Sequence, residues 1–272
     1  MVNRVYDRDQ PVDGSQEKPD QLNRQDFAKH LAEIIHIKPD EDCLTVSVEG
    51  EWGSGKSSVL AMVKRHLKAQ ENPPIIIEFN PWLIGDVDSL VQKFLVQFSA
   101  QLDIPDRPKE TLRVAQELLS YSKLFDVVKL IPGAEPWASV FKSVISGVGS
   151  ATGKIGKLKE LDIHGRKIKV KNAVERLGVS IVVIIDDIDR LTPAEAFEVI
   201  KLSKAVADFK GVTFVLAFDQ EYLAAALESN NIHNSNQFIE KIVQLRIPLP
   251  LVSIYDMHDL SNKYMDDLSE NN

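Results

Sequence analysis

A glycine-rich stretch, GEWGSGKS, runs from Gly50 to Ser57 and carries residue types suited to holding phosphate. Its spacing matches G-x-x-x-x-G-K-[ST], in which the glycines let the backbone turn and bring N–H groups against a phosphate. The lysine of such a loop, here Lys56, reaches the outer phosphates, and the next hydroxyl, Ser57, ligates Mg²⁺. A helix N-terminus directly after the loop would add partial positive charge. The stretch therefore predicts a nucleotide site, with these binding residues: Gly50, Glu51, Trp52, Gly53, Ser54, Gly55, Lys56, Ser57 and Ser58.

A second group of polar residues ends the apolar run VSIVVIIDDID, from Val179 to Asp189. A near-continuous apolar run is typical of a strand buried on both faces of a parallel sheet. A magnesium nucleotide enzyme needs one carboxylate for the metal's hydration shell and another to orient or deprotonate water. We assign Asp186 to Mg²⁺ and Asp187 to water. The alternative is that these acids cap the next helix, a role open to Asp189.

Two more strand ends supply candidates in the same crevice. Asn80 ends the apolar run PIIIEFN and could position water, whereas Trp82 beside it is interpreted as a packing residue. Asp219 follows the run VTFVLAF and could lie near the γ-phosphate. Asp219 could equally cap the helix that follows it.

The elements that must position these residues alternate along the chain. Apolar runs predict strands at 44–49, 74–80, 179–189, 212–218 and 245–247. Helical spacing predicts helices at 24–37, 57–70, 87–102, 192–207, 220–227 and 236–243. Thr192, Pro193 and Glu195 form a helix-start signature. Five strands alternating with helices indicate an α/β fold with a doubly wound parallel sheet.

Residues 103–178 interrupt this alternation, and we interpret them as a mainly helical insertion between the two nucleotide motifs. Helices are expected around 109–125 and 137–148. The segment 137–153 is apolar, but it carries Lys142 and is shorter than the roughly 20 residues that a membrane span needs. We expect it to be a surface-lying or packed helix.

A basic stretch ends the insertion. Between Lys154 and Arg176 there are eight basic and three acidic residues. A solvated helix face is the favoured interpretation, and docking on nucleic acid or an anionic membrane is the alternative.

Composition and net charge limit the classes of protein to which the chain can belong. With 44% hydrophobic and 26% charged residues the chain is an ordinary globular sequence, and its net charge of -8 argues against a surface that binds DNA throughout. The single cysteine, Cys43, cannot form an internal disulfide and has no catalytic histidine pattern around it. The first residues lack the apolar region of a secretory signal and are interpreted as a polar arm, so we expect a cytoplasmic protein.

The nucleotide base is predicted by elimination. A guanine-reading N-K-x-D box is missing, since the nearest sequence, NKYMD at 262–266, has one residue too many and lies in an acidic C-terminal helix. ATP is therefore the expected nucleotide.

The chain resembles the KAP family of P-loop NTPases. The resemblance spans 20–250 and is carried by GEWGSGKSS, IEFNPW, IDDIDRL, LAFDQEYL and FIEKIVQLRIPLP. It implies an ATPase core related to AAA+ and signal-transduction ATPases, with strand order 5-1-4-3-2. The polar N-terminal arm, at 1–19, precedes the part that resembles the family. The resemblance also implies the start of a C-terminal helical lid, expected to be truncated, at 251–272. Family members often carry transmembrane helices in the region of 103–178, a pattern from which this chain departs.

The resemblance further places residues 20–24 and the helix after them against the adenine, with Leu22 and Phe27 as candidate contacts. It places Lys241 where related ATPases present a trans-acting basic finger, with Arg246 as the rival; a salt bridge is the competing interpretation.

Two functions follow from these features. The first is a MgATP-hydrolysing switch that acts as a homo-oligomer or on a protein partner, resembling family members linked to membrane organisation and phage defence. The second is a nucleotide-gated binding module with little hydrolysis.

Overall fold

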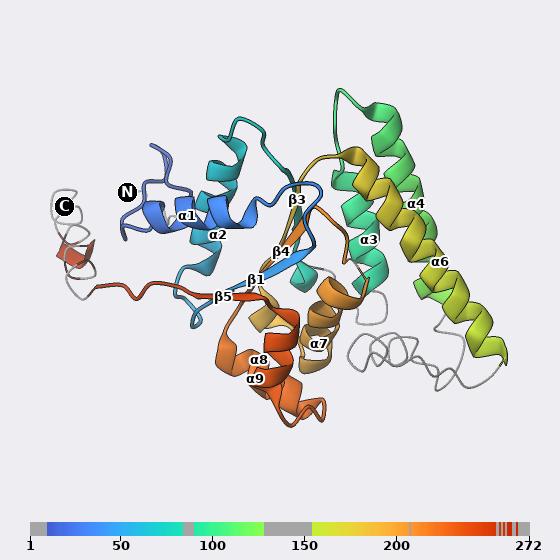
Figure 1. Cartoon of the computed structure of the whole chain (residues 1–272). Coiled ribbons are helices and arrows are strands. Elements are labelled where there is room, and N and C mark those ends of the chain that lie inside the picture. Colours follow the sequence, from blue (N-terminus) through green and yellow to red (C-terminus); the bar gives the residue numbers. More distant parts are fainter. Residues whose placement is uncertain are drawn as a thin grey trace, which may run out of the picture.

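The structure is a computed structural model of the 272-residue chain, which describes residues 10–83, 90–127, 154–206 and 208–253, and single positions beyond them. Its centre is one parallel sheet in the order β2-β3-β4-β1-β5 (Figure 1). This order confirms the predicted 5-1-4-3-2. The strands are β1 (Leu44–Glu49), β2 (Ile75–Phe79), β3 (Ile181–Ile185), β4 (Val212–Phe218) and β5 (Leu245–Pro248).

Helices cover both faces of the sheet, as the doubly wound fold requires (Figure 1). They are α1 (Gln25–Ile35), α2 (Lys56–Lys68), α3 (Leu90–Gln101), α4 (Pro108–Val127), α6 (Lys154–Leu177), α7 (Pro193–Lys201), α8 (Gln220–Ser229) and α9 (Ser235–Ile242). One turn of π-helix, Leu202–Val206, continues α7. The predicted capping box of α7 is confirmed, because Thr192 and Glu195 bond reciprocally.

Two hydrophobic cores lie on opposite faces because successive side chains of a strand point in opposite directions. In β3, Ile181, Val183 and Ile185 join the larger core, together with α3, α4 and α6 to α9. The alternate residues Val182 and Ile184 join the smaller core, with α1 and α2. All five residues of β3 are buried, which explains its unbroken apolar sequence. Strand β3 is shorter than predicted, since the chain leaves the sheet after Ile185.

Helices α4 and α6, both from the predicted insertion, pack against each other and against the rest of the larger core. Tyr121 of α4 and Val170 and Leu177 of α6 are buried there. The basic stretch lies on α6, where Lys169 and Arg176 are exposed. The second helix expected in the insertion, and the segment 137–153, lie outside the described residues. None of the helices that the structure describes has the length and apolar character of a membrane span.

Candidate active site

The glycine-rich loop joins β1 to α2 at the carboxyl end of the sheet. Gly53 and Gly55 adopt positive φ values of 77° and 91°, which residues with a Cβ rarely adopt. Gly55 directly precedes α2, so the backbone N–H groups of the first helical turn open toward the cavity above the loop. A Cβ on Gly55 would lie 2.7 Å from Nη1 of Arg24. The conformation therefore depends on glycine at this position.

Arg24, at the start of α1, supports this loop from a buried position. Its side chain is 4% exposed, and its guanidinium donates one hydrogen bond to the carbonyl of Ser54 and another, of 2.9 Å, to the carbonyl of Pro250. Burial lowers the pKa of Arg24, and the nearby Asp20 carboxylate opposes that effect. An arginine nevertheless stays charged in a protein. Its positive charge thus lies beneath the predicted phosphate site.

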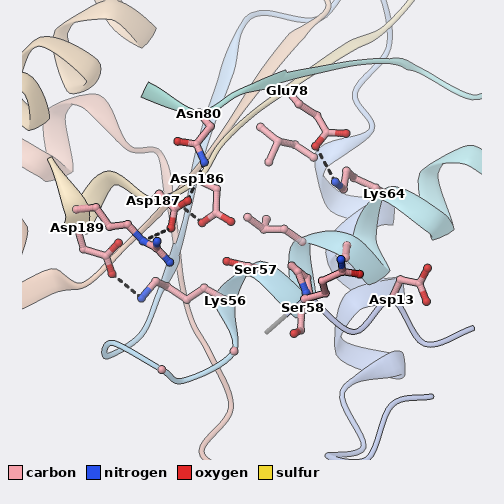
Figure 2. A pocket seen from close by; sticks show the side chains of 18 of the residues that line it. Asp13, Lys56, Ser57, Ser58, Lys64, Glu78, Asn80, Asp186, Asp187 and Asp189 are labelled. Carbon is pink, nitrogen blue, oxygen red and sulfur yellow. Dashed lines mark hydrogen bonds and ion pairs between the residues drawn. The ribbon is translucent and has the colours of Figure 1, made fainter. Parts of the chain in front are cut away.

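A cavity of about 680 Å³ separates this loop from the carboxyl ends of β2 and β3 (Figure 2). That volume is in the usual range for small-molecule sites, about 300–1,000 Å³. Loop residues, strand-end residues and part of the N-terminal arm line it. The predicted site residues among them are Trp52, Gly53, Gly55, Lys56, Ser57, Ser58, Asn80, Asp186 and Asp187.

Ser57 and Asp186 meet inside the cavity. The Ser57 hydroxyl is hydrogen-bonded to the Asp186 carboxylate, which also accepts a bond of 2.8 Å from the backbone N–H of Asp187. Burial raises the pKa of Asp186, whereas these two hydrogen bonds oppose that shift. A hydroxyl and a carboxylate are hard oxygen donors of the kind that Mg²⁺ takes.

The donor set therefore fits Mg²⁺ held by few protein ligands, with substrate phosphates completing its coordination. Within the described ranges no cluster of three or more His, Cys, Asp or Glu residues could hold a metal alone. If bound, Mg²⁺ would neutralise charge on the phosphates.

Asp187 is the second residue of a tight acidic turn, residues 186–190, and both of its carboxylate oxygens are engaged. Oδ2 accepts a 2.7 Å hydrogen bond from Nδ2 of Asn80, and Oδ1 lies 2.7 Å from Nε of Arg190 in an ion pair. The residue has a φ of 59°, a left-handed conformation that is uncommon outside glycine and least unfavourable for Asp and Asn. Strained backbone of this kind is concentrated at functional sites.

Asp189 faces the glycine-rich loop rather than the following helix. Its carboxylate lies 2.8 Å from Nζ of Lys56, and the two side chains are only 6% and 8% exposed (Figure 2). Nζ of Lys56 also donates to the carbonyls of Gly50 and Glu51, at 2.9 and 3.1 Å. The suggested capping role of Asp189 is wrong, since Thr192 caps α7. The pair instead joins the two loops across the cavity.

Trp52 is the exposed tip of the glycine-rich loop, with 63% of its surface accessible. The guanidinium carbon of Arg190 lies 4.9 Å from the centre of its ring, within the range of a cation–π contact. Trp82, interpreted as a packing residue, is 52% exposed, and its packing role stays a prediction.

Comparison with known proteins identifies the family of the chain. The sequence pattern of the KAP family P-loop domain matches residues 24–271 of the chain. The chain belongs to the KAP family. This KAP domain is 25% identical, over 248 residues, to the Phage T7 exclusion protein of Escherichia coli (strain K12). The match covers 86% of the chain but only 34% of that relative, so the chain spans about a third of its length.

Among solved structures, the KAP domain is similar to the Aeropyrum pernix ORC2 protein in its ADPNP-ADP complexes. The superposition has a TM-score of 0.45 and 13% sequence identity, and it covers 89% of this chain and 51% of the other.

Two predicted polar residues of the KAP domain lie away from the cavity lining. Asp219 caps α8, where its carboxylate accepts hydrogen bonds from the N–H groups of Glu221 and Tyr222 at 2.9 and 3.3 Å. Two roles were considered for Asp219, and the structure supports the role as a helix cap. Lys241 is exposed on α9 and does not line the cavity. Its rival Arg246 forms a two-pronged ion pair with Glu49, at 2.7 and 2.8 Å, which raises the pKa of Arg246.

The predicted adenine contacts also lie elsewhere. Phe27 packs against the smaller core, and neither Leu22 nor Phe27 lines the cavity. The N-terminal arm does: Gln10, Pro11 and Asp13 contribute to the lining.

The arm is held against α1 and α2 by direct hydrogen bonds. The backbone N–H of Val12 donates to Oγ of Ser58 at 3.1 Å, and the carbonyl of Gly14 accepts from the Gln25 amide at 2.9 Å and from Arg65. No sequence pattern in the arm points to these contacts, because backbone groups make them.

Cys43 is unsuited to act as a nucleophile. Burial raises its pKa to about 12, so the thiol stays protonated at neutral pH.

Proposed function

We propose that this KAP domain binds MgATP and hydrolyses it to ADP and phosphate. The observation that carries the proposal is the convergence on one cavity of the Ser57–Asp186 pair, the Asn80–Asp187 pair and the ammonium group of Lys56. These are the groups that phosphoryl transfer to water requires: a metal site, a carboxylate for water and a cation for the transferred phosphate.

The chain's own residues would act as follows. Backbone N–H groups of residues 53–58 and the ammonium group of Lys56 hold the β- and γ-phosphates. Ser57 and Asp186 hold Mg²⁺. Asp187 accepts a proton from water as the water oxygen forms its bond to the γ-phosphorus, and Asn80 fixes the orientation of that carboxylate. The bond from the γ-phosphorus to the β–γ bridging oxygen breaks, and ADP leaves with that electron pair.

The test separates binding from chemistry. In Asp187→Asn, phosphate release should fall by about 10²- to 10⁴-fold, the usual contribution of a positioned base, while ATP affinity changes little. In Lys56→Ala, equilibrium affinity itself should fall. Glu221→Gln, an exposed carboxylate change on α8, serves as the control and should behave as wild type. Undiminished phosphate release from Asp187→Asn would contradict the assignment.

A nucleotide-gated module without turnover is the second candidate. The observation that favours it is that the cationic group of Lys56 and both oxygens of Asp187 already have protein partners. Such a domain would change state on nucleotide binding alone. Wild-type protein that binds ATP but releases no phosphate would establish this candidate in place of the first.

We also propose that this domain acts in phage defence, a proposal supported by the relative's name, Phage T7 exclusion protein. Action in the cytoplasm, and self-association or binding of a protein partner, are further proposals that rest on the sequence and not on that name. Size-exclusion chromatography with ATP, with ADP and without nucleotide tests the self-association. A nucleotide-dependent shift in mass is the expected result, and identical elution in all three conditions would contradict it.

A further inference from the structure

Arg190 lies where the two loops of the cavity approach each other. Its Nε is 2.7 Å from Oδ1 of Asp187, its guanidinium lies over the ring of Trp52, and the residue lines the cavity. The side chain is 42% exposed, far more than that of Asp187, which is 18% exposed. A cation with this placement touches the predicted base, the loop tip and the space for the outer phosphates.

The ion pair creates a difficulty for Asp187 as a base. One carboxylate oxygen holds the Asn80 amide and the other faces Arg190, so an incoming water would have to compete for an occupied oxygen. Of the two partners, Arg190 is the easier to displace. Its side chain is long and partly exposed, and ion pairs at such sites contribute at most about 1 kcal/mol.

We propose that Arg190 leaves Asp187 and binds the γ-phosphate when a nucleoside triphosphate enters the cavity. By this exchange Arg190 distinguishes a triphosphate from a diphosphate bound to its own chain. The proposal rests on the nucleotide site proposed above. A guanidinium forms paired, charge-assisted hydrogen bonds with phosphate oxygens, and a terminal phosphate carries more negative charge than one carboxylate. The ring of Trp52 offers a flat face on which the guanidinium can turn without losing its cation–π contact.

The exchange links recognition to chemistry. With a diphosphate, Arg190 stays on Asp187 and the carboxylate remains engaged. With a triphosphate, Oδ1 of Asp187 becomes free to accept a hydrogen bond from water, while Asn80 keeps Oδ2 in place. Arg190 thus binds the γ-phosphate and also controls when Asp187 is available.

The competing explanation is that Arg190 only stabilises the acidic turn through its contact three residues back. Loss of a purely structural contact would weaken ATP and ADP binding alike. The selectivity for triphosphate over diphosphate therefore distinguishes the two explanations.

The experiment measures equilibrium affinities of the full chain for ADP and for a non-hydrolysable ATP analogue, each with Mg²⁺. In Arg190→Gln the preference for the triphosphate should fall by about 10- to 100-fold, the value of a hydrogen bond between charged groups. ADP affinity should stay within a few-fold of wild type. Arg190→Lys keeps the positive charge but not the paired N–H donors of the guanidinium. Its preference for the triphosphate should therefore lie between those of wild type and Arg190→Gln. Lys171→Ala, which removes a remote ion pair with Glu175 on α6, is the matched control and should keep the wild-type preference.

A second readout follows Arg190 itself. In a Trp82→Phe, Trp137→Phe background, Trp52 is the remaining tryptophan of the sequence and reports on the contact with the guanidinium. Its fluorescence should respond differently to the triphosphate and to ADP, and Arg190→Gln should abolish the difference.

The outcomes separate this inference from the proposed function. If wild type prefers the triphosphate and Arg190→Gln retains that preference, or loses both affinities equally, the exchange is wrong and the nucleotide site stands. If wild type binds neither nucleotide, both proposals fall. If wild type binds both nucleotides equally, the exchange alone is wrong.

Discussion

The two loops that face each other across the cavity reach their shapes in different ways. The glycine-rich loop depends on its backbone, with positive φ values at Gly53 and Gly55 and N–H groups directed by the start of α2. The acidic turn depends on side chains, since Asp187 is held by Asn80 and Arg190 although its own φ is unfavourable. A backbone cradle can bind any phosphate of the right size, whereas side chains that contact one another can respond to which phosphate arrives. If the proposed nucleotide site is correct, phosphate recognition would fall to the glycine-rich loop and the response to the γ-phosphate would fall to the acidic turn.

The largest effect should come from adding a methyl group to the backbone-shaped loop. Gly55→Ala places a Cβ at a φ of 91° and 2.7 Å from Nη1 of Arg24, so it strains the loop and displaces its support. Nucleotide affinity should fall by about 100-fold or more.

Gly53→Ala is the matched control for this change. Its φ is 77°, but the added Cβ meets nothing within 4 Å. Backbone strain alone, about 1–2 kcal/mol, predicts roughly a tenfold loss or slightly more. Equal losses in the two variants, measured by titration calorimetry, would show that the contact with Arg24 is unimportant.

Removing Arg24 should destabilise the fold next most strongly. Arg24→Ala leaves the carbonyls of Ser54 and Pro250 without their donor in a buried region, which costs about 2–4 kcal/mol in the free energy of unfolding. Urea denaturation measures this loss. Arg24→Lys keeps the charge but lacks the fork that reaches two carbonyls, so it should recover only part of the stability. Full recovery by lysine would show that charge rather than geometry matters.

The acidic turn should tolerate a substitution that is compatible with the left-handed backbone conformation at residue 187. Asp187→Asn keeps a residue that accepts left-handed φ, so its stability should fall by less than about 1 kcal/mol. Asp187→Ala loses that local preference and the Asn80 contact, and should cost about 2 kcal/mol. Thermal unfolding of both variants gives the comparison. A larger loss for asparagine than for alanine would contradict the view that side-chain contacts shape this turn.

The smallest expected effect is the coupling between the loops through Trp52 and Arg190. A double-mutant cycle of Trp52→Leu and Arg190→Gln should give about 0.5–1 kcal/mol in ligand-free protein, the value of an exposed cation–π contact. Trp52→Phe should keep part of it, since a ring remains. Zero coupling would mean that this cation–π contact does not connect the two loops, which would leave the contacts of Lys56 with Asp189 and of Ser57 with Asp186.

Much of the fold follows from local sequence. The buried strand β3 and the capping box at Thr192 were predictable, because each depends on neighbours in the chain. The order of the strands was predicted from the resemblance to the KAP family and not from the local sequence. The placement of Ser57 opposite Asp186 followed from the rule that parallel strands expose their carboxyl ends along one edge.

The contacts that the sequence could not predict join distant segments. Nothing local separates Asp189 as a partner of Lys56 from Asp189 as a helix cap, since both need only an acid at that point. Arg24 contacts Ser54 and Pro250, residues 30 and 226 positions away, and Val12 reaches Ser58 through a backbone N–H that any residue but proline provides. Asp219 was ambiguous because a polar residue at a strand end can cap the following helix instead.

The shared guanidinium of Arg24 also has a mechanical consequence. One rigid planar group holds the carbonyl of Ser54 in the phosphate loop and the carbonyl of Pro250, where the chain leaves β5. A displacement of either carbonyl must move the guanidinium or break a bond to it. A displacement of the chain beyond Pro250 would therefore be transmitted to the phosphate loop through the Arg24 side chain. In the reverse direction, a shift of the phosphate loop on nucleotide binding would displace the chain at Pro250.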